Sequence, residues 1–188
     1  MVKQLSTTKI VLVVLGVLVL LTGLWGVTTY NSLVGKDETV NQMWGNVQSA
    51  YQRRADLLPN LVATVKGASD FEKKMQTDIA ALRTGISNSK SPAELDLMGQ
   101  KINTAINVVY ENYPQIKSTE GYLKLQDQLE GTENRIKVER DLYNAAVREY
   151  SVKVRTFPSN LIAGIFNFEA REMFEAAAGS DVVPEVTF

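Results

Sequence analysis

The chain of 188 residues has 20 lysine and arginine residues against 21 aspartate and glutamate residues, for a formal net charge of −1, and it contains neither cysteine nor histidine. Without an overall basic field, the composition gives no support to a nucleic-acid partner. The missing residue types exclude disulfides, thiol nucleophiles, the usual zinc ligands and the commonest general base. We therefore expect no cofactor and no catalytic activity, in a chain whose length suits one domain plus a membrane anchor.

The first predicted element is a transmembrane helix over residues 10–30, which follows a short tail at residues 1–9. No charged residue occurs between Lys9 and Lys36, and about 20 apolar residues at about 1.5 Å each cross a bilayer core of about 30 Å. A cleaved signal peptide is the alternative, but the sequence LWGVTTYN at the end of the segment is a poor cleavage site. We therefore expect residues 10–30 to anchor the chain in a lipid bilayer.

Residues 31–174 form the predicted body, and its first part follows a heptad pattern. From Val40 to Leu82 the steps alternate between four and three residues through apolar positions, with Arg54 and Glu72 as the exceptions. This spacing predicts one long helix that packs along other helices.

Local signals set the expected limits of this helix. Asp37 is the predicted N-cap. A kink or break is expected near Asp56–Pro59, because proline removes a helical hydrogen bond and clashes with the preceding turn. Gly85 and the polar run at residues 87–92 should end the helix.

A shorter helix follows, with Ser91 as its N-cap and Pro92 at its first position. Glu94 lies three residues after Ser91, as in a capping box. Pro114 closes this helix.

The third predicted helix starts near Ser118 and runs for about 37 residues, or about 55 Å, to Pro158. Large apolar residues recur along it at intervals of seven: Tyr122, Leu129, Ile136, Tyr143, Tyr150 and Phe157. No stretch shows sustained alternation with period two, so no sheet is expected. The predicted fold class is all-α: an N-terminal transmembrane helix followed by an antiparallel bundle of long helices.

Residues 157–174 are rich in large apolar side chains, and residues 175–188 form a predicted extended tail. Ser159 or Asn160 should cap a short helix, and Asn167 should start another. The aromatic side chains need cover, either as a lid on the end of the bundle or in contact with the membrane or another subunit. The residues expected to make such a contact are Phe157, Leu161, Ile162, Ile165, Phe166 and Phe168.

A group of charged and turn-forming residues supplies the candidate structural or interaction sites: Arg53, Arg54, Asp56, Pro59, Asn60, Glu72, Glu133 and Arg140. They can form a clamp for a carboxylate or phosphate, or they can pair inside the bundle and fix the register of its helices. We favour pairing, because Arg54 falls in the apolar seam. Arg54 and Glu72 lie about 27 Å apart along one helix, so Glu133 and Arg140 on the third helix are their expected partners. A di-iron carboxylate site is disfavoured because such sites use Glu-x-x-His motifs.

Several motifs occur together in a specific order: YNSLV at 30–34, QRRADLLPNLVATVKG at 52–67, ENYPQIKS at 111–118, QLEGTENRIKVERDLYNAAVREY at 128–150 and FPSNLIAGIFNF at 157–168. Over roughly residues 30–174 the chain resembles the LemA family of bacterial membrane proteins. The resemblance implies an N-terminal anchor, a bundle of long helices and no established catalytic activity. The chain departs from the family at Phe71, where histidine is common.

These observations predict a non-catalytic interaction or scaffolding module of the bacterial cell envelope, homo-oligomeric through its heptad faces. It would span the inner membrane once, because Lys3 and Lys9 before the segment favour a cytoplasmic N-terminus and a body on the outer face. The alternative is a membrane-remodelling or lipid-binding protein that uses residues 157–174 at the bilayer. A hydrolase that uses Glu72 or Glu133 is the least favoured interpretation.

Overall fold

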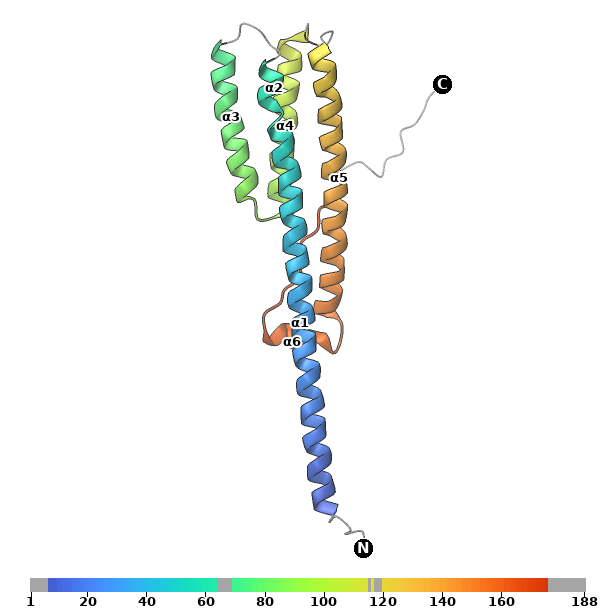
Figure 1. Cartoon of the computed structure of the whole chain (residues 1–188). Helices are drawn as coiled ribbons and strands as arrows, with labels where there is room; N and C mark the ends of the chain where they lie inside the picture. Colours follow the sequence, from blue (N-terminus) through green and yellow to red (C-terminus); the bar gives the residue numbers. More distant parts are fainter. Residues whose placement is uncertain (1–6, 64–68, 115, 117–119, 176–188) are drawn as a thin grey trace, which may run out of the picture.

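The computed structural model describes residues 7–63, 69–114, 116 and 120–175, and for residues 69–72 it describes the backbone only. These ranges contain helices and no strand, so the predicted all-α fold is confirmed. In chain order the helices are α1 Thr7–Ala55, α2 Leu58–Ala63, α3 Ser69–Asn88, α4 Pro92–Asn112, α5 Glu120–Arg155 and α6 Ser159–Ile165. Helix α1 extends far beyond the others, while α3, α4 and α5 pack beside its second half (Figure 1).

Helix α1 is a single helix of 49 residues, about 74 Å long, that passes from the apolar segment into the body. Its apolar part is long enough to cross a membrane, and the rest of the described molecule buries none of it. The expected N-cap at Asp37 is wrong, because Asp37 lies inside α1 and pairs instead with Arg171, at 2.9 Å between Oδ1 and Nη2. No proline precedes Asp37, and the anchor and the body share one helix.

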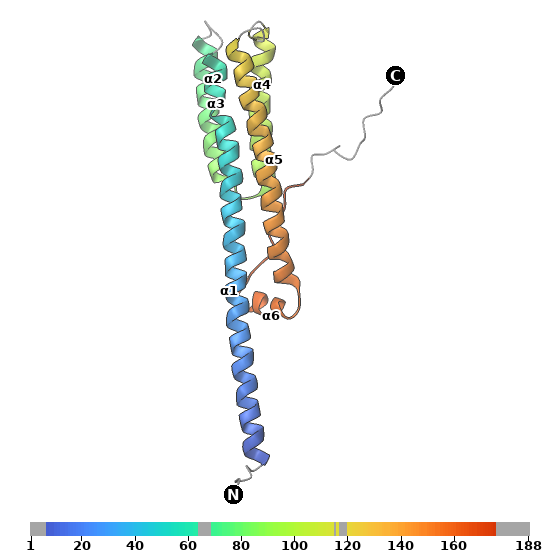
Figure 2. The ribbon, with the colours of Figure 1, turned by 45° about the vertical axis from the view of Figure 1, so that its right-hand side comes forward.

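The prediction of a single long helix between Val40 and Leu82 is wrong. The chain forms α1, α2 and α3 instead, and α3 returns antiparallel to α1, as the colour order in Figures 1 and 2 shows. The break expected near Pro59 is present, since α1 ends at Ala55 and α2 begins at Leu58. Proline is tolerated there because the amides of the first turn have no partner within the helix. A heptad pattern specifies which face is apolar, but it does not specify the direction of the chain.

The core runs along the interior faces of α1–α5. The recurring residues of α5 from Tyr122 to Tyr150 are buried as expected, and Val147 and Tyr150 are almost completely enclosed. The next member of the series, Phe157, lies beyond the end of α5 and is 74% exposed. The seam therefore ends one heptad earlier than the sequence predicts.

The predicted start of α4 is confirmed. The Ser91 hydroxyl accepts a hydrogen bond from the Glu94 amide at 3.3 Å, and Pro92 occupies the first turn. The Glu94 carboxylate accepts a hydrogen bond from the Lys90 amide at 2.7 Å. The first contact satisfies an amide of the first helical turn, and the second satisfies the amide of the residue just before the N-cap.

The end of the body differs from the sequence expectations. Helix α6 has Pro158 at its N-cap position, without a side-chain cap, and the Ser159 hydroxyl donates instead to the carbonyls of Lys153 and Thr156, at 2.6 and 2.8 Å. No helix starts at Asn167, which has a left-handed φ of 56°. Residues 168–175, here called the strap, continue without helical structure back along the bundle.

Candidate functional site

A polar cleft of about 400 Å³ lies between α1, α4 and α5. Its walls include two arginines, two acids and an asparagine, together with a buried tyrosine: Arg54, Arg140, Asp96, Glu133, Asn103 and Tyr51. Arg54, Glu133 and Arg140 were candidates from the sequence, whereas Tyr51, Asp96 and Asn103 were not. The three helices therefore bring together charges that are far apart in the sequence.

Arg54 forms the expected ion pair with Glu133 of α5. Its Nη2 also donates to Asn103 Oδ1 of α4, at 2.9 Å. The Arg54 side chain is only 12% exposed, and burial lowers its pKa below the ordinary value. One guanidinium thus joins three helices, and removal of Glu133 would leave it without its charged partner.

Arg140 pairs with an acid of α4 that the sequence did not indicate. Its Nη1 lies 2.9 Å from Asp96 Oδ1 of α4, and the Tyr51 hydroxyl donates to the same carboxylate oxygen at 3.0 Å. Burial, followed by the nearby Asp96 charge, raises the pKa of Tyr51 to about 12. Tyr51 therefore stays protonated and remains a hydrogen-bond donor at neutral pH.

The other predicted residues do not join this cleft. Arg53, Pro59 and Asn60 are exposed at the end of α1 and on α2, and Asp56 pairs with Arg83 of α3 at 2.7 Å. The side chain of Glu72 lies outside the described residues. Pairing within the bundle describes the contacts that Arg54, Asp56 and Arg140 make.

The strap is held against the bundle by contacts that the sequence did not indicate. Phe174 is buried between Trp44 and Tyr143, at ring-centroid distances of 5.9 and 5.4 Å. Asn144 bonds to both backbone groups of Phe174: its Oδ1 accepts from the amide at 2.8 Å and its Nδ2 donates to the carbonyl at 2.9 Å. Arg140 lies over the Phe174 ring, 4.6 Å from its centroid. The strap thereby closes one edge of the polar cleft.

The two expected fates of residues 157–174 are divided between two groups of side chains. Phe168 packs against the core and Phe174 is buried, as in a lid. Phe157, Leu161, Ile165 and Phe166 remain 54–74% exposed around α6, and Ile162 is half-buried. The described residues thus leave more than half of each of these four side chains uncovered.

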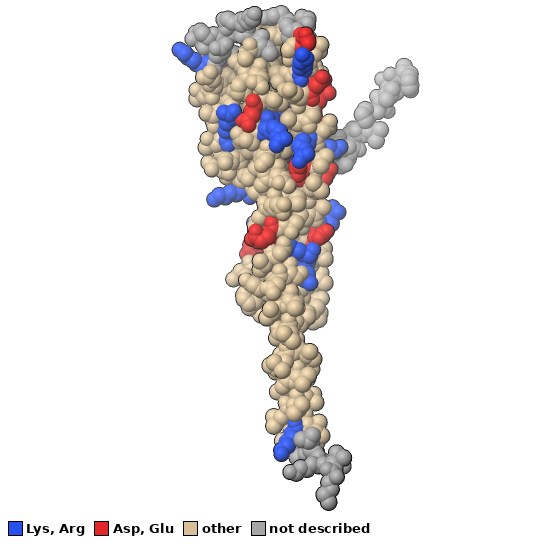
Figure 3. All heavy atoms as spheres, in the orientation of Figure 1, with Lys and Arg blue, Asp and Glu red and all other residues tan. Residues whose placement is uncertain are grey.

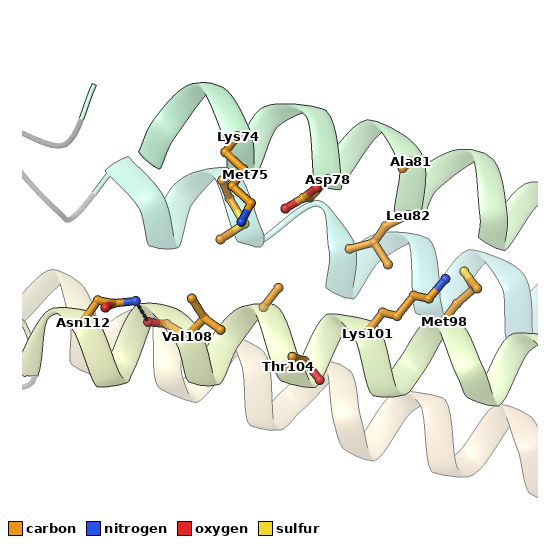
Figure 4. Close-up of a pocket in the computed structure, with 11 residues that line it drawn as sticks. Lys74, Met75, Asp78, Ala81, Leu82, Met98, Lys101, Thr104, Val108 and Asn112 are labelled. Atoms are coloured by element: carbon orange, nitrogen blue, oxygen red, sulfur yellow. Dashed lines mark hydrogen bonds between the residues drawn. The ribbon is translucent and has the colours of Figure 1, made fainter. Parts of the chain in front are cut away.

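An apolar groove of about 570 Å³ lies between α3 and α4, on a different side of α4 from the polar cleft. Figure 4 shows Met75 and Leu82 of α3 directed toward Val108 and Lys101 of α4, with Lys74 at one end. The lysines lie beside apolar side chains, so the groove is amphipathic. Its shape and lining suit an apolar segment better than a small polar substrate.

Among the described residues, no group of three or more acidic side chains is placed to hold a metal ion. Glu139, which is buried, pairs with Arg135 at 2.8 Å on the same helix. The charged side chains near the polar cleft mainly hold helices and the strap in place.

Comparisons with known proteins cover most of the chain. A family model described as the LemA family matches residues 43–188. Protein LemA of Metamycoplasma hominis is 25% identical over 151 residues, covering 78% of this chain and 69% of that protein. Magnetosome proteins MamQ 1 and MamQ 2 of Paramagnetospirillum magneticum are each 26% identical over 181 aligned residues, covering 81% of this chain and 66% of theirs. The chain thus spans about two thirds of the length of these relatives.

Proposed function

This chain belongs to the LemA family. We propose that it is a membrane-anchored, non-catalytic interaction module of the bacterial cell envelope, which binds its partners through its helical body. The observation that carries this proposal is the continuity of α1 from the apolar segment into the bundle. Residues 10–30 would span the inner membrane, with the N-terminus in the cytoplasm and the body on the outer face. A bundle fixed in this way would present its surfaces to partners at a constant position relative to the membrane.

Site-specific labelling tests the anchor and its orientation. The chain has no cysteine, and Ser87 is exposed in the last turn of α3, whereas Ser89, just after this helix, is buried. The Ser87→Cys variant in intact cells should react with a membrane-impermeant maleimide, while Ser6→Cys should react only after lysis. The opposite pattern would place the body in the cytoplasm, and labelling of both sites in intact cells would contradict a membrane span.

We propose a homo-oligomeric contact along the outer face of α5. Val138, Leu142 and Val152 are 48–58% exposed and are spaced by four and then ten residues, so they lie within about 80° of one another around α5, and an exposed apolar stripe of this kind favours packing against another helix. In detergent-solubilised full chain, Leu142→Glu should lower the mass measured by light scattering. Leu97→Glu is the matched control, because Leu97 on α4 is also 48% exposed. An unchanged mass in both variants, or a monomeric starting protein, would contradict this contact.

The groove between α3 and α4 is the surface that we propose for a protein partner. Its apolar floor suits the apolar face of an amphipathic helix. Carboxylates beside that face would meet Lys74 and Lys101, which outnumber the one acid of the lining, Asp78. Crosslinking from a photoreactive amino acid at Thr104 in the groove should capture a partner that a probe at exposed Lys137 of α5 does not. Loss of that product in Lys74→Glu/Lys101→Glu would support the charge pairing, and its persistence would contradict it.

A second candidate function is membrane remodelling, which the exposed apolar side chains of residues 157–166 favour. Liposomes that contain the full chain should change shape in electron micrographs. The change should be lost in Phe157→Ser/Phe166→Ser and kept in Met173→Ser, whose side chain is 41% exposed on the strap. Smooth, unaltered liposomes with the native chain would leave the interaction module as the better proposal.

A further inference from the structure

Helix α6 packs beside α1 where the apolar segment of α1 ends. The ring of Phe166 lies 4.7 Å from that of Tyr30, and Ile162 Cδ1 would lie 3.7 Å from a Cβ atom placed on Gly26. Leu33, one turn further along α1, is completely buried. Residues 157–166 therefore lie at the depth of Gly26–Tyr30, which is the edge of the proposed span.

An uncharged band surrounds this level of the molecule. Residues 10–35 of α1 and residues 156–168 around α6 contain no charged side chain. In Figure 3 the narrow lower part of the molecule is tan between the charged atoms of the body and the blue atoms near its lower end. Phe157, Leu161 and Ile165 are more than half exposed within the band. The apolar surface of the span thus continues onto α6, as expected for an element that rests in the membrane interface.

Cations gather directly above this band. A cleft of about 620 Å³ between α1 and the end of α5 is lined by Lys36, Arg148 and Lys153, with Trp25 and Phe157 on its apolar side. Its one acidic lining residue, Glu149, pairs with Lys36 at 2.9 Å. Arg148 and Lys153 form no ion pair with any described residue, so the cleft retains positive charge.

The cleft lies at the height of the lipid headgroups if α1 spans the bilayer. Lys9 and Lys36 are 27 residues apart, or about 40 Å along α1, which matches the thickness of about 40–45 Å of a bilayer with its headgroups. The ion pair with Lys36 fixes the level of Glu149. Because α5 descends toward the span, Lys153 lies about 6 Å closer to the bilayer core than Glu149 does.

We propose that the cleft formed by Lys36, Arg148 and Lys153 above Trp25 and Phe157 binds the headgroup phosphate of an anionic phospholipid in the adjoining leaflet. The cations would pair with the phosphate, and the acyl chains would lie against the uncharged band of α1 and α6. This inference rests on the membrane anchor of the proposed function. It adds a ligand of defined chemistry and a site that neither the sequence motifs nor the polar cleft indicates.

A simpler explanation is that the cations stabilise α5 itself, because the C-terminal end of a helix dipole is partly negative and attracts basic residues in the last turn. Lys153 and Arg155 lie in that turn, but Arg148 is two turns earlier and Lys36 belongs to α1. The dipole therefore does not account for three cations from two helices around one cleft. A dipole role would also be insensitive to the lipid, and this difference makes the two explanations separable.

Quenching of tryptophan fluorescence by brominated lipids tests the site on the full chain in vesicles. Trp25 lines the cleft, whereas Trp44 lies 19 residues further along α1, about 28 Å away and beyond contact with lipid. Vesicles of phosphatidylcholine would receive the same small fraction of either brominated phosphatidylglycerol or brominated phosphatidylcholine. We expect stronger quenching by the phosphatidylglycerol probe, and a preference that weakens as salt concentration rises.

The variant Arg148→Gln/Lys153→Gln should reduce this preference by about fivefold for each cation removed. The matched control is Lys73→Gln/Lys137→Gln, which removes the same charge from exposed positions outside the cleft. Equal loss of preference in the two variants would reveal an effect of net charge and would overturn the site.

The remaining outcomes separate the lipid site from the anchor. Equal quenching of the native chain by both probes would overturn the lipid site while leaving the anchor intact, because Trp25 would still contact acyl chains. Absence of quenching by either probe would refute the anchor and, with it, the lipid site. Helix content measured by circular dichroism should match between the two double variants.

Discussion

Replacing Arg140 by glutamine should loosen the strap and destabilise the bundle by about 2–3 kcal/mol. Arg140 bonds to both oxygens of Asp96, at 2.9 and 3.3 Å, and charged hydrogen bonds contribute about 1.5–3 kcal/mol. Its position over the Phe174 ring adds about 1 kcal/mol. The two contributions sum to about 2.5–4 kcal/mol. Because the side chains of Arg140 and Asp96 are 25% and 32% exposed, solvent screening reduces the expected loss to about 2–3 kcal/mol.

Urea unfolding of the full chain in detergent micelles measures this loss, and a double-mutant cycle with Asp96→Asn assigns it to the pair. Trp44 is a local reporter, because its ring stacks on Phe174 at 5.9 Å with an interplanar angle of 18°. We expect a coupling energy of about 1 kcal/mol or more and a red shift of Trp44 emission in Arg140→Gln.

The control for this experiment is Lys137→Gln, an exposed substitution on the same helix, which should change stability by less than about 0.5 kcal/mol. A coupling energy below about 0.5 kcal/mol, together with unchanged Trp44 emission, would refute the view that Arg140 holds the strap to α4.

Gly99→Ala should destabilise the fold by about 1–3 kcal/mol in thermal unfolding, because the added methyl group would lie 2.7 Å from Cε1 of buried Tyr51. Gly45→Ala, with nothing within 4 Å of the new atom, should instead stabilise by up to about 1 kcal/mol, so equal effects would contradict this packing. Burial raises the Tyr51 pKa from 10.0 to about 12, so the unfolded chain loses this proton first and stability should fall as pH rises through that range; an unchanged alkaline slope in Tyr51→Phe would oppose this assignment. Ser91→Ala should cost about 1 kcal/mol and speed hydrogen exchange of the Glu94 amide, and unaltered exchange would argue against the cap.

The sequence predicted those parts of the fold that depend on local signals. Ser91 and Pro92 identify the start of α4 because both act within one helical turn. The recurrence from Tyr122 to Tyr150 identifies α5 because one unbroken apolar face over four heptads is typical of a packed helix. The pairing of Arg54 with Glu133 also followed, since a guanidinium in an apolar seam requires a charged partner.

The reversal between α2 and α3 did not follow, because the heptad phase continues from one helix to the other as though the chain were straight. A signal was present, however, in the order Gly67, Ser69 and Glu72. Glycine followed by serine, with glutamate three residues after the serine, is a typical helix end and helix start. These two local signals, taken ahead of the heptad pattern, predict a new helix at Ser69, where α3 begins.

The strap contacts were unpredictable for a different reason. Asn144 and Phe174 are 30 residues apart, and each is ordinary in its local sequence. An asparagine that bonds to both backbone groups of one distant residue leaves no periodic or compositional signature. Asp96 likewise became part of the polar cleft only because the antiparallel return of the chain brings α4 beside α5 and Arg140.

The continuity of α1 explains how these separate surfaces can act together. From Tyr30 to Ala55 the helix rises about 38 Å. Helices α3 and α4 pack beside this part, toward the end of the bundle away from α6 (Figure 1), and the groove lies between them. With no linker between anchor and body, the lipid cleft would lie at the membrane surface while the groove extends well above it. Contacts between lipid and Arg148 or Lys153 would therefore act on α5, the helix that also holds the strap through Asn144 and Arg140. The rigid helix gives each surface a fixed height, so the lipid and the protein partner would be bound at different levels of one molecule.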